Sequence, residues 1–277
     1  DCDAEILGLN RPVDLAVLAD VRLFVEALLA ELKDLDPGDI DARQRRIDEW
    51  AKRAGDLRTF LRSAAADEDA APLHSAFVPL VCREVFDDDA VLVIDGGNTA
   101  VWTNLYHENR TPGSLLSTFK FGMLGAGLGQ ALGAQVACPG RQVYAIVGDG
   151  AMGFHVQELE TALRNGLPVI YLVLCDKQWG MVKLTQTIGL QMLRPAIGTE
   201  QQGTINADFE EIEFDKVAVA MGCHGERVAD PNELEPALRR CIESGKPSVI
   251  HVDVDPNMHL FAPGLQEFKA MHQEPGA

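Results

Sequence analysis

The sequence lacks closely spaced cysteines, long apolar runs and any excess of basic residues. No uninterrupted apolar stretch approaches the roughly 20 residues needed to span a bilayer, and no signal peptide is visible. Without a CxxC pair or zinc-like spacing, cysteines inside apolar runs are typical of reduced core thiols. The absences predict a soluble, cytoplasmic protein whose six scattered cysteines stay unpaired: Cys2, Cys82, Cys138, Cys175, Cys223 and Cys241.

Acidic residues dominate the charge of the 277-residue chain. It carries 42 Asp and Glu against 24 Lys and Arg, a formal net charge of −18. Such a surplus of carboxylates repels nucleic acids and anionic membranes, so neither is an expected partner. A phosphate ligand would need local help from backbone N–H groups, a helix N-terminus or a metal ion.

The first 72 residues differ from the rest. The chain starts at Asp1 without an initiator methionine, and residues 13–18 read as a strand followed by a helix that Asp20 caps. One such βα unit is too small to stand alone, so residues 1–35 look like an entry into the middle of a fold. Residues 36–72 form a predicted helical linker, charged and helical over 41–64.

From residue 73 the pattern becomes regular. Continuous apolar strands alternate with helices, which predicts an α/β fold: a doubly wound parallel sheet with helices on both faces. We assign residues 73–265 to this domain and residues 266–277 to a C-terminal tail. The expected strands are 91–94, 143–147, 169–174 and 248–252, and the expected helices are about 74–85, from near 99, 125–137, 154–165 and 231–244.

Three loops rich in Gly or Asp follow strands, at residues 95–99, 148–153 and 175–181. Parallel sheets of this kind bind ligands at the carboxyl ends of their strands, where the strand order reverses. Gly148-Asp149-Gly150 allows a close backbone approach to phosphate and offers a carboxylate to a hard cation. Taken alone, this triplet also fits an ordinary strand-to-helix turn.

A second carboxylate favours a metal site over an ordinary turn. Asp176 follows the next strand, 27 residues after Asp149, and a right-handed crossover returns the chain beside the first loop. Mg²⁺ prefers oxygen ligands and keeps part of its coordination for phosphate and water. The spacing therefore predicts that Asp149 and Asp176 face one another across a magnesium ion.

These residues carry a family resemblance over about residues 13–254. The run from Gly148 through Asp176 to Gln178 resembles the thiamine-diphosphate signature of the acetohydroxyacid synthase, 2-hydroxyacyl-CoA lyase and benzaldehyde lyase superfamily. The resemblance implies thiamine diphosphate and Mg²⁺ as cofactors, with Asp149, Asp176 and the backbone carbonyl of Gln178 as metal ligands. Asp176 stands where the family usually has asparagine, and Cys175 replaces the asparagine before it.

The resemblance also implies the rest of the cofactor site. Asn98 and Thr99 match polar contacts to the terminal phosphate, although either residue would also serve as a helix N-cap. Leu124 falls where an apolar wedge bends the cofactor, and Gly122 where a carbonyl accepts from the aminopyrimidine; a core leucine is the alternative for Leu124. The cofactor-binding set is Gly97, Asn98, Thr99, Gly122, Leu124, Gly148, Asp149, Gly150, Ala151, Met152, Asp176, Gln178, Gly180 and Met181.

No catalytic residue is expected on this chain. His155, His224 and His251 lie near strand ends or helix starts, but a lone histidine is more often a satisfied polar residue. The family's activating glutamate belongs to a pyrimidine-binding domain, which is expected as a separate subunit or an upstream segment. The chain alone is therefore predicted to be inactive and to work as a homo- or hetero-oligomer.

The resemblance implies a thiamine-diphosphate-dependent lyase or synthase acting on 2-keto acids, with acetolactate-synthase-like carboligation or decarboxylation as the first expectation. A 2-hydroxyacyl-CoA or oxalyl-CoA lyase is an alternative, which the short tail of mixed charge disfavours. A non-catalytic cofactor-binding subunit is a second alternative, which the intact metal ligands disfavour. A nicotinamide dehydrogenase lacks support because no strand–GxGxxG–helix unit is present.

Overall fold

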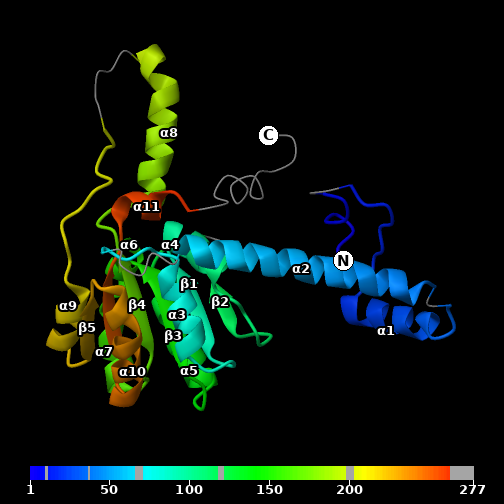
Figure 1. Ribbon diagram of the computed structural model, residues 1–277, viewed down its shortest axis with the longest axis horizontal. Helices are drawn as coiled ribbons and strands as arrows, with labels where there is room; N and C mark the ends of the chain where they lie inside the picture. The colour runs from blue at the N-terminus through cyan, green and yellow to red at the C-terminus, as the bar shows by residue number, and fades with distance from the viewer. Residues whose placement is uncertain (10–11, 37, 66–70, 118–121, 198–202, 263–277) are drawn as a thin grey trace. The chain divides into compact units, whose positions relative to one another are not determined.

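The computed structural model describes residues 1–9, 12–36, 38–65, 71–117, 122–197 and 203–262 (Figure 1). The chain divides into two compact units, one built on Asp1–Arg58 and the other on Thr59–Leu265. The prediction placed the start of the main domain at residue 73. No helix in the described ranges is long and apolar enough to cross a lipid bilayer.

The first unit contains the predicted N-terminal helix but not the predicted strand. Helix α1 (Val21–Leu32) begins where expected, since the Asp20 carboxylate accepts a hydrogen bond of 3.1 Å from Leu23 N. Residues 13–18 form no strand, so that prediction was wrong. A strand needs a neighbour to complete its ladder, and the described part of this unit offers none. Helix α2 (Ile40–Ala65) is the predicted charged helix.

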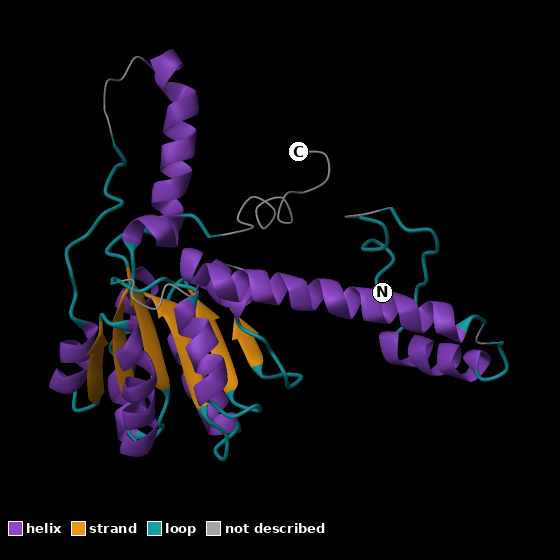
Figure 2. Ribbon diagram, viewed as in Figure 1, coloured by secondary structure: helices purple, strands orange, loops and turns teal. Residues whose placement is uncertain are grey.

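The second unit is built on a sheet of six parallel strands in the order β2-β1-β3-β4-β6-β5 (Figure 2). This arrangement confirms the doubly wound parallel sheet, and all four predicted strands are present within one residue of their expected bounds. The strands are β1 (Val91–Asp95), β2 (Leu115–Ser117), β3 (Val143–Gly148), β4 (Ile170–Cys175), β5 (His224–Val228) and β6 (Ser248–Asp253).

Side chains of the central strands alternate between two apolar cores, one on each face of the sheet. Leu172 and Leu174 of β4 point into a core shared with α3 (Phe77–Val85) and α10 (Leu234–Ser244). Tyr171 and Val173 point into the opposite core, shared with α5 (Ala126–Ala137), α7 (Glu158–Arg164) and α9 (Phe214–Ala220). Burial on both faces explains why the strands read as continuous apolar runs rather than alternating ones.

Several elements differ from their predicted form. The helix expected at 154–165 consists of two, α6 (Asp149–His155) and α7, and the one expected at 231–244 is a 3-10 turn, η1 (Pro231–Glu233), followed by α10. Helix α6 starts five residues early because it begins immediately at the carboxyl end of β3. The sequence pattern did not predict α8 (Gly180–Ile197), α9, α11 (Pro256–Leu260), β2 or β5.

The strand order places three connections at one edge of the sheet. After β1 the chain moves outward to β2, and it then returns to place β3 on the other side of β1. The carboxyl ends of β1, β3 and β4 are therefore adjacent, and α4 (Asn98–Tyr106), α6 and α8 begin just beyond them (Figure 1). Ligands of doubly wound sheets bind at such a reversal of strand order.

Candidate functional site

The loops that follow β1, β3 and β4 pack together so closely that side chains would not fit at several positions. A Cβ atom on Gly97 would lie 2.7 Å from the Met181 Cβ, and one on Gly180 would lie 2.7 Å from Asn98 Nδ2. The predicted loops 95–99, 148–153 and 175–181 thus form one site at the carboxyl edge of the sheet.

Asp149 lies at the first position of α6 and links two of these loops. Its Oδ1 accepts a hydrogen bond of 2.7 Å from Gly150 N, and its Oδ2 accepts one of 2.8 Å from Lys177 N. The residue is only 4% exposed. The backbone N–H of the β4 loop therefore fixes the carboxylate that follows β3.

Asp176 is the second buried carboxylate, 7% exposed, and Gln178 orients it. Gln178 Nε2 donates to Asp176 Oδ2 at 2.9 Å and to the Pro256 carbonyl at 2.7 Å. Gln178 Oε1 in turn accepts from Lys183 Nζ at 2.8 Å. The Gln178 side chain is thus fully engaged, and its backbone carbonyl, which accepts from Gly180 N at 2.9 Å, has a second lone pair available to a cation.

The two carboxyl groups disfavour each other's charge. Burial raises the pKa of Asp149 to about 6, although hydrogen bonds from Lys177 N and Gly150 N oppose the shift. Burial, and then the nearby Asp149 carboxylate, raise the pKa of Asp176 to about 8. Two buried carboxyl groups that repel one another form a site for a cation, which removes the repulsion and keeps both ionised.

Lys177, which follows Asp176 and hydrogen-bonds Asp149, has a backbone conformation that is rare for a residue other than glycine. Its φ of 59° is in the left-handed region, which side chains with a Cβ seldom adopt. Neighbouring backbone holds it there, because Lys177 O accepts from Phe209 N at 3.1 Å and Trp179 N donates to Ala207 O at 2.8 Å. Backbone strain of this kind concentrates at functional sites.

Asn98 supplies a buried amide that the described residues do not satisfy. It is 3% exposed, and neither its Oδ1 nor its Nδ2 has a hydrogen-bond partner in the described part of the chain. Leaving such a group unpaired costs on the order of 1–3 kcal/mol. The amide lies beside Gly180, and Asp176 Oδ2 is also near the position that a Gly180 Cβ would take. The Asn98 side chain therefore has a hydrogen-bond donor and an acceptor available to a ligand at this site.

The remaining predicted residues are placed as follows. Thr99 is buried, and its Oγ1 lies 3.1 Å from where a Gly148 Cβ would stand. Ala151 and Met152 are buried in the first turn of α6, so only their backbone N–H groups are available to a ligand. Gly122 is exposed with a φ of 60°, and Leu124 is half-buried. Among the described residues, no hydrogen bond joins Gly122 or Leu124 to the other loops.

An apolar cavity of about 320 Å³ borders the buried carboxyl group of Asp149 and is lined by Asp149, Gly150, Gly153, Phe154, Trp179, Phe209 and Ile212. The Trp179 ring packs edge-on against Phe154 and Phe209, with centroids 5.8 and 5.5 Å apart. Trp179 also covers Gly150, where a Cβ would lie 2.5 Å from its Cζ3. Trp179 thus borders a cavity beside the candidate metal site, whereas Met181 packs on Gly97 instead.

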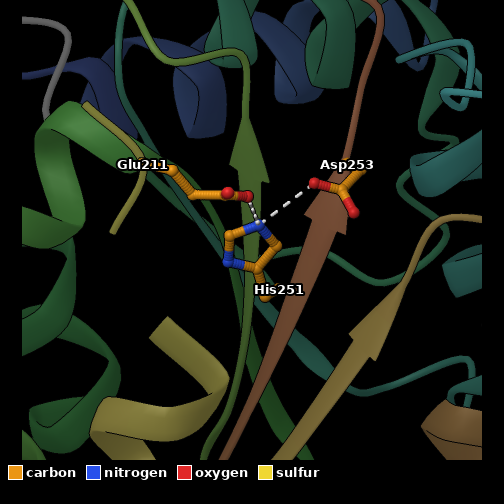
Figure 3. A group of neighbouring side chains, drawn as sticks. All are labelled: Glu211, His251 and Asp253. Atoms are coloured by element: carbon orange, nitrogen blue, oxygen red, sulfur yellow. Dashed lines mark hydrogen bonds and ion pairs between the residues drawn. The ribbon is translucent and has the colours of Figure 1, made fainter. Parts of the chain in front are cut away.

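One other group of described residues places three potential metal ligands close together: Glu211, His251 and Asp253, with ligating atoms within 4.8 Å (Figure 3). Arg227 already supplies the positive charge there. Its Nη2 lies 2.5 Å from Glu211 Oε1, and its Nε lies 2.9 Å from Asp253 Oδ2. Lys177 Nζ also pairs with Glu211 at 3.4 Å. This cluster is an ion-pair network that anchors the loop after β4.

The three histidines that the sequence singled out have separate environments. His224 lies at the amino end of β5, at the edge opposite the site, and pairs with Glu226. His251 is buried within β6, and burial lowers its pKa. His155 lies beside Gly125, and its buried Nδ1 has no partner among the described residues.

Sequence reasoning missed two residues that shape the site. Asp95 Oδ2 accepts from Gly127 N at 2.7 Å and so ties the start of α5 to the end of β1. His259, from α11, hydrogen-bonds Thr99 from a position 160 residues away in sequence. Asp95 was visible at a strand end, but no local signal pointed to His259. Cys175, the departure from the family pattern, donates to the Val173 carbonyl at 3.3 Å.

Comparisons with known proteins agree with this geometry. The family model described as "Thiamine pyrophosphate enzyme, C-terminal TPP binding domain" matches residues 95–252, more than half of the chain. The chain belongs to the thiamine pyrophosphate enzymes. Thiamine pyrophosphate (TPP) is another name for thiamine diphosphate, so the family prediction and the thiamine diphosphate part of the cofactor prediction are confirmed. The matched residues run from Asp95 to Val252 and include most of the candidate site.

Individual relatives of this TPP-binding chain are longer proteins. A probable acetolactate synthase of Mycobacterium bovis is 33% identical over 253 residues, covering 90% of this chain and 42% of the relative. The acetolactate synthase isozyme 2 large subunit of Escherichia coli is 31% identical over 258 residues, covering 92% and 42%. The chain thus spans about two-fifths of the length of these relatives.

A solved structure supports the same fold. The thiamine diphosphate-dependent 4-hydroxybenzoylformate decarboxylase of Rhodococcus jostii RHA1 matches with a TM-score of 0.59 and 26% sequence identity. The match covers 67% of this chain and 33% of that one. The TPP-binding domain therefore shares its architecture with an enzyme of the same family.

Gly150→Ala should disturb the site, and Gly153→Ala should not. The Cβ added at position 150 would force Trp179 to move, at a cost of about 1–3 kcal/mol in the free energy of unfolding. Gly153 lies on the same helix with nothing within 4 Å of its Cβ position, so alanine there should be neutral or stabilising by up to about 1 kcal/mol. Urea unfolding of both variants measures this. Equal effects would contradict the packing of Trp179 on Gly150.

The metal-free domain should lose stability as the pH rises. Because the folded pKa of Asp176 is raised, its contribution is complete below the unfolded value of about 3.9 and is lost as pH rises through about 8. The free energy of unfolding in EDTA should fall by at least about 1 kcal/mol between pH 5 and 8.

Asp176→Asn should remove most of that decline, because the amide neither titrates nor repels Asp149. Urea unfolding at several pH values compares the variant with the unaltered chain. If the free energy of unfolding fell equally with pH in both proteins, the carboxyl pair would not be the cause of the pH dependence. Mg²⁺ with thiamine diphosphate should restore stability at pH 8 by binding the folded state.

Proposed function

We propose that this chain is the diphosphate- and magnesium-binding part of a TPP-dependent lyase or synthase that acts on 2-keto acids. The observation that carries the proposal is the buried pair Asp149 and Asp176, two oxygen ligands that follow adjacent strands and are 4% and 7% exposed. Acetolactate-synthase-like carboligation is the first expectation. Relatives that align with 90% and 92% of this chain are named acetolactate synthases.

Mg²⁺ would be held by the carboxylates of Asp149 and Asp176 and the backbone carbonyl of Gln178. All three are oxygen donors, the ligand type that Mg²⁺ prefers, and the remaining positions suit phosphate oxygens and water. The aspartate in place of the usual asparagine adds a negative charge. We expect tighter Mg²⁺ binding at high pH and competition from protons as the pH falls toward 6.

The diphosphate would be bound by neutral donors, since the site itself is acidic. The first turns of α4, α6 and α8 carry backbone N–H groups that have no partner within their own helix, and the Asn98 amide has none among the described residues. Gly97, Gly148, Gly150 and Gly180 let the loops that carry these N–H groups pack together, since a Cβ at each would press against a neighbouring loop. Leu124 would support the bend between the rings, and Gly122 would accept from the aminopyrimidine.

When bound, TPP supplies an electron-accepting ring to carbon–carbon bond cleavage or formation next to a carbonyl. The residues of this chain hold and orient it and exclude water. Trp179, Phe154 and Phe209 form an apolar wall beside Asp149, which lowers the local dielectric and strengthens its attraction to a cation.

A second candidate is decarboxylation of a 2-keto acid with an aromatic side chain. The cavity lined by Phe154, Trp179 and Phe209 favours an apolar or aromatic group near the site. The solved relative from Rhodococcus is named a 4-hydroxybenzoylformate decarboxylase. Turnover of an aromatic in preference to a small aliphatic 2-keto acid would favour this candidate over carboligation.

The activating glutamate is expected on a pyrimidine-binding domain or subunit, because the aligned part covers only 42% of the relatives. Under this proposal residues 1–35 end a central domain and residues 36–72 link it to the TPP-binding domain at 73–265. The chain would work in an oligomer and in the cytoplasm, which suits free cysteines such as the buried Cys82 and Cys241.

Asp149→Ala should abolish the binding of thiamine diphosphate with Mg²⁺. Removing a metal ligand is expected to weaken the affinity at least about 100-fold, beyond the effect of removing a supporting residue. Isothermal calorimetry with and without Mg²⁺ on the full chain measures it. Asp87→Ala is the matched control, because Asp87 is exposed before the amino end of β1, at the opposite edge of the sheet.

Two results would contradict the proposal. One is unaltered binding by Asp149→Ala, and the other is binding that does not depend on Mg²⁺. Activity gives a separate check: the purified chain should turn over no 2-keto acid until a pyrimidine-binding partner is added. A non-catalytic subunit would instead leave the activity of the assembled enzyme unchanged when Asp149 is replaced.

A further inference from the structure

A buried histidine outside the predicted site contacts the phosphate-side loop. His259 lies on α11, is 3% exposed, and has hydroxyl groups at both ring nitrogens. Its Nδ1 lies 2.7 Å from Ser75 Oγ, and its Nε2 lies 3.3 Å from Thr99 Oγ1. Thr99 is the second residue of α4, beside Gly148, and it belongs to the proposed diphosphate site.

The backbone of α11 is held by hydrogen bonds from two other elements. Trp102 Nε1 donates to the His259 carbonyl at 2.9 Å, and Gln178 Nε2 donates to the carbonyl of Pro256, the first residue of α11. Helix α11 is therefore tied to α4 and to the metal loop at once. Burial lowers the pKa of His259 to about 3, so the ring is neutral at physiological pH.

A neutral imidazole carries one N–H group, so it donates through one nitrogen and accepts through the other. If Nδ1 carried the proton, it would donate to Ser75, and Thr99 would have to donate to Nε2. The Ser75 hydrogen would then have no acceptor among the described residues, although Ser75 is 1% exposed. An unsatisfied buried donor of this kind is costly.

In the opposite direction the hydrogen without an acceptor belongs to Thr99, at the start of α4 where a bound anion would accept it, rather than to Ser75. Ser75 donates to Nδ1, Nε2–H donates to Thr99 Oγ1, and the Thr99 hydroxyl hydrogen is left for an acceptor. The described residues place no acceptor for it other than the His259 ring. A phosphate oxygen at the start of α4 would be such an acceptor.

We propose that His259 is a positioning residue for the cofactor: its Nε2–H fixes the Thr99 hydroxyl as a hydrogen-bond donor to the diphosphate. The inference rests on the proposed function, because it needs a diphosphate beside Thr99. In this proposal α11, which is distant in sequence from every predicted site residue, determines the direction in which the Thr99 hydroxyl donates its hydrogen bond.

Two substitutions of His259 separate this role from simple packing. In His259→Gln, the amide nitrogen retains an N–H donor where Nε2–H lies, whereas His259→Leu fills the space without one. The affinity of the full chain for thiamine diphosphate at saturating Mg²⁺ should fall about tenfold in the leucine variant, as expected for one lost hydrogen bond to a charged group. The glutamine variant should stay within about threefold of the unaltered chain.

A double-mutant cycle with Thr99→Val identifies the route of the effect. Thr99→Val alone should lower the affinity about tenfold, and His259→Leu should then add less than about twofold, because the hydroxyl that it orients is gone. Additive losses would show that His259 acts by another route and would overturn the inference.

The tautomer is read directly from ¹⁵N NMR of the ring in the unaltered chain loaded with Mg²⁺ and thiamine diphosphate. Protonated Nε2 with unprotonated Nδ1 is the expected result, and protonated Nδ1 overturns the inference even if a variant fails to fold. If the unaltered chain binds no thiamine diphosphate, the proposed function itself fails. If it binds normally and His259→Leu binds equally well, only the role of His259 fails.

Discussion

Two carboxyl groups are buried next to one another at the carboxyl edge of the sheet, and hydrogen bonds from the surrounding loops hold them there. Asp149 and Asp176 follow adjacent parallel strands, so the fold brings their carboxyl groups together and away from water. Burial raises both pKa values, and the Asp149 charge raises that of Asp176 further, which makes the metal-free site costly above neutral pH. Under the proposed function, a divalent cation would offset this cost by keeping both groups ionised.

The groups around the pair limit its freedom to relax. Lys177 N holds Asp149 through a left-handed backbone conformation, and Gln178 holds Asp176 while binding the Pro256 carbonyl. The Arg227 network fastens the same loop from outside through Glu211. The carboxylates therefore cannot separate without breaking contacts that extend to β6 and α11. If the pair binds a cation as proposed, these contacts hold the two carboxyl groups in position before the cation binds.

Sequence periodicity predicted the central strands well because each is buried on both faces, which leaves a long apolar run between Gly-rich loops. It failed at β2 and β5, which lie at the sheet edges and are short or polar, and at residues 13–18, which form no strand and pair with none among the described residues. The Asp149 and Asp176 pair was predictable because a crossover between neighbouring strands fixes its position. His259 was not, because its contact with Thr99 spans 160 residues and follows from packing alone.

Replacement of Mg²⁺ by Mn²⁺ in crystals grown with thiamine diphosphate tests the central claim most directly. Anomalous scattering locates the Mn²⁺ ion without assumptions about the protein. We expect one peak in contact with a carboxylate oxygen of Asp149, a carboxylate oxygen of Asp176 and the Gln178 carbonyl, at about 2.0–2.3 Å, as for oxygen ligands of such ions. A peak at Glu211, His251 and Asp253 instead, or none near Asp149, would contradict the account.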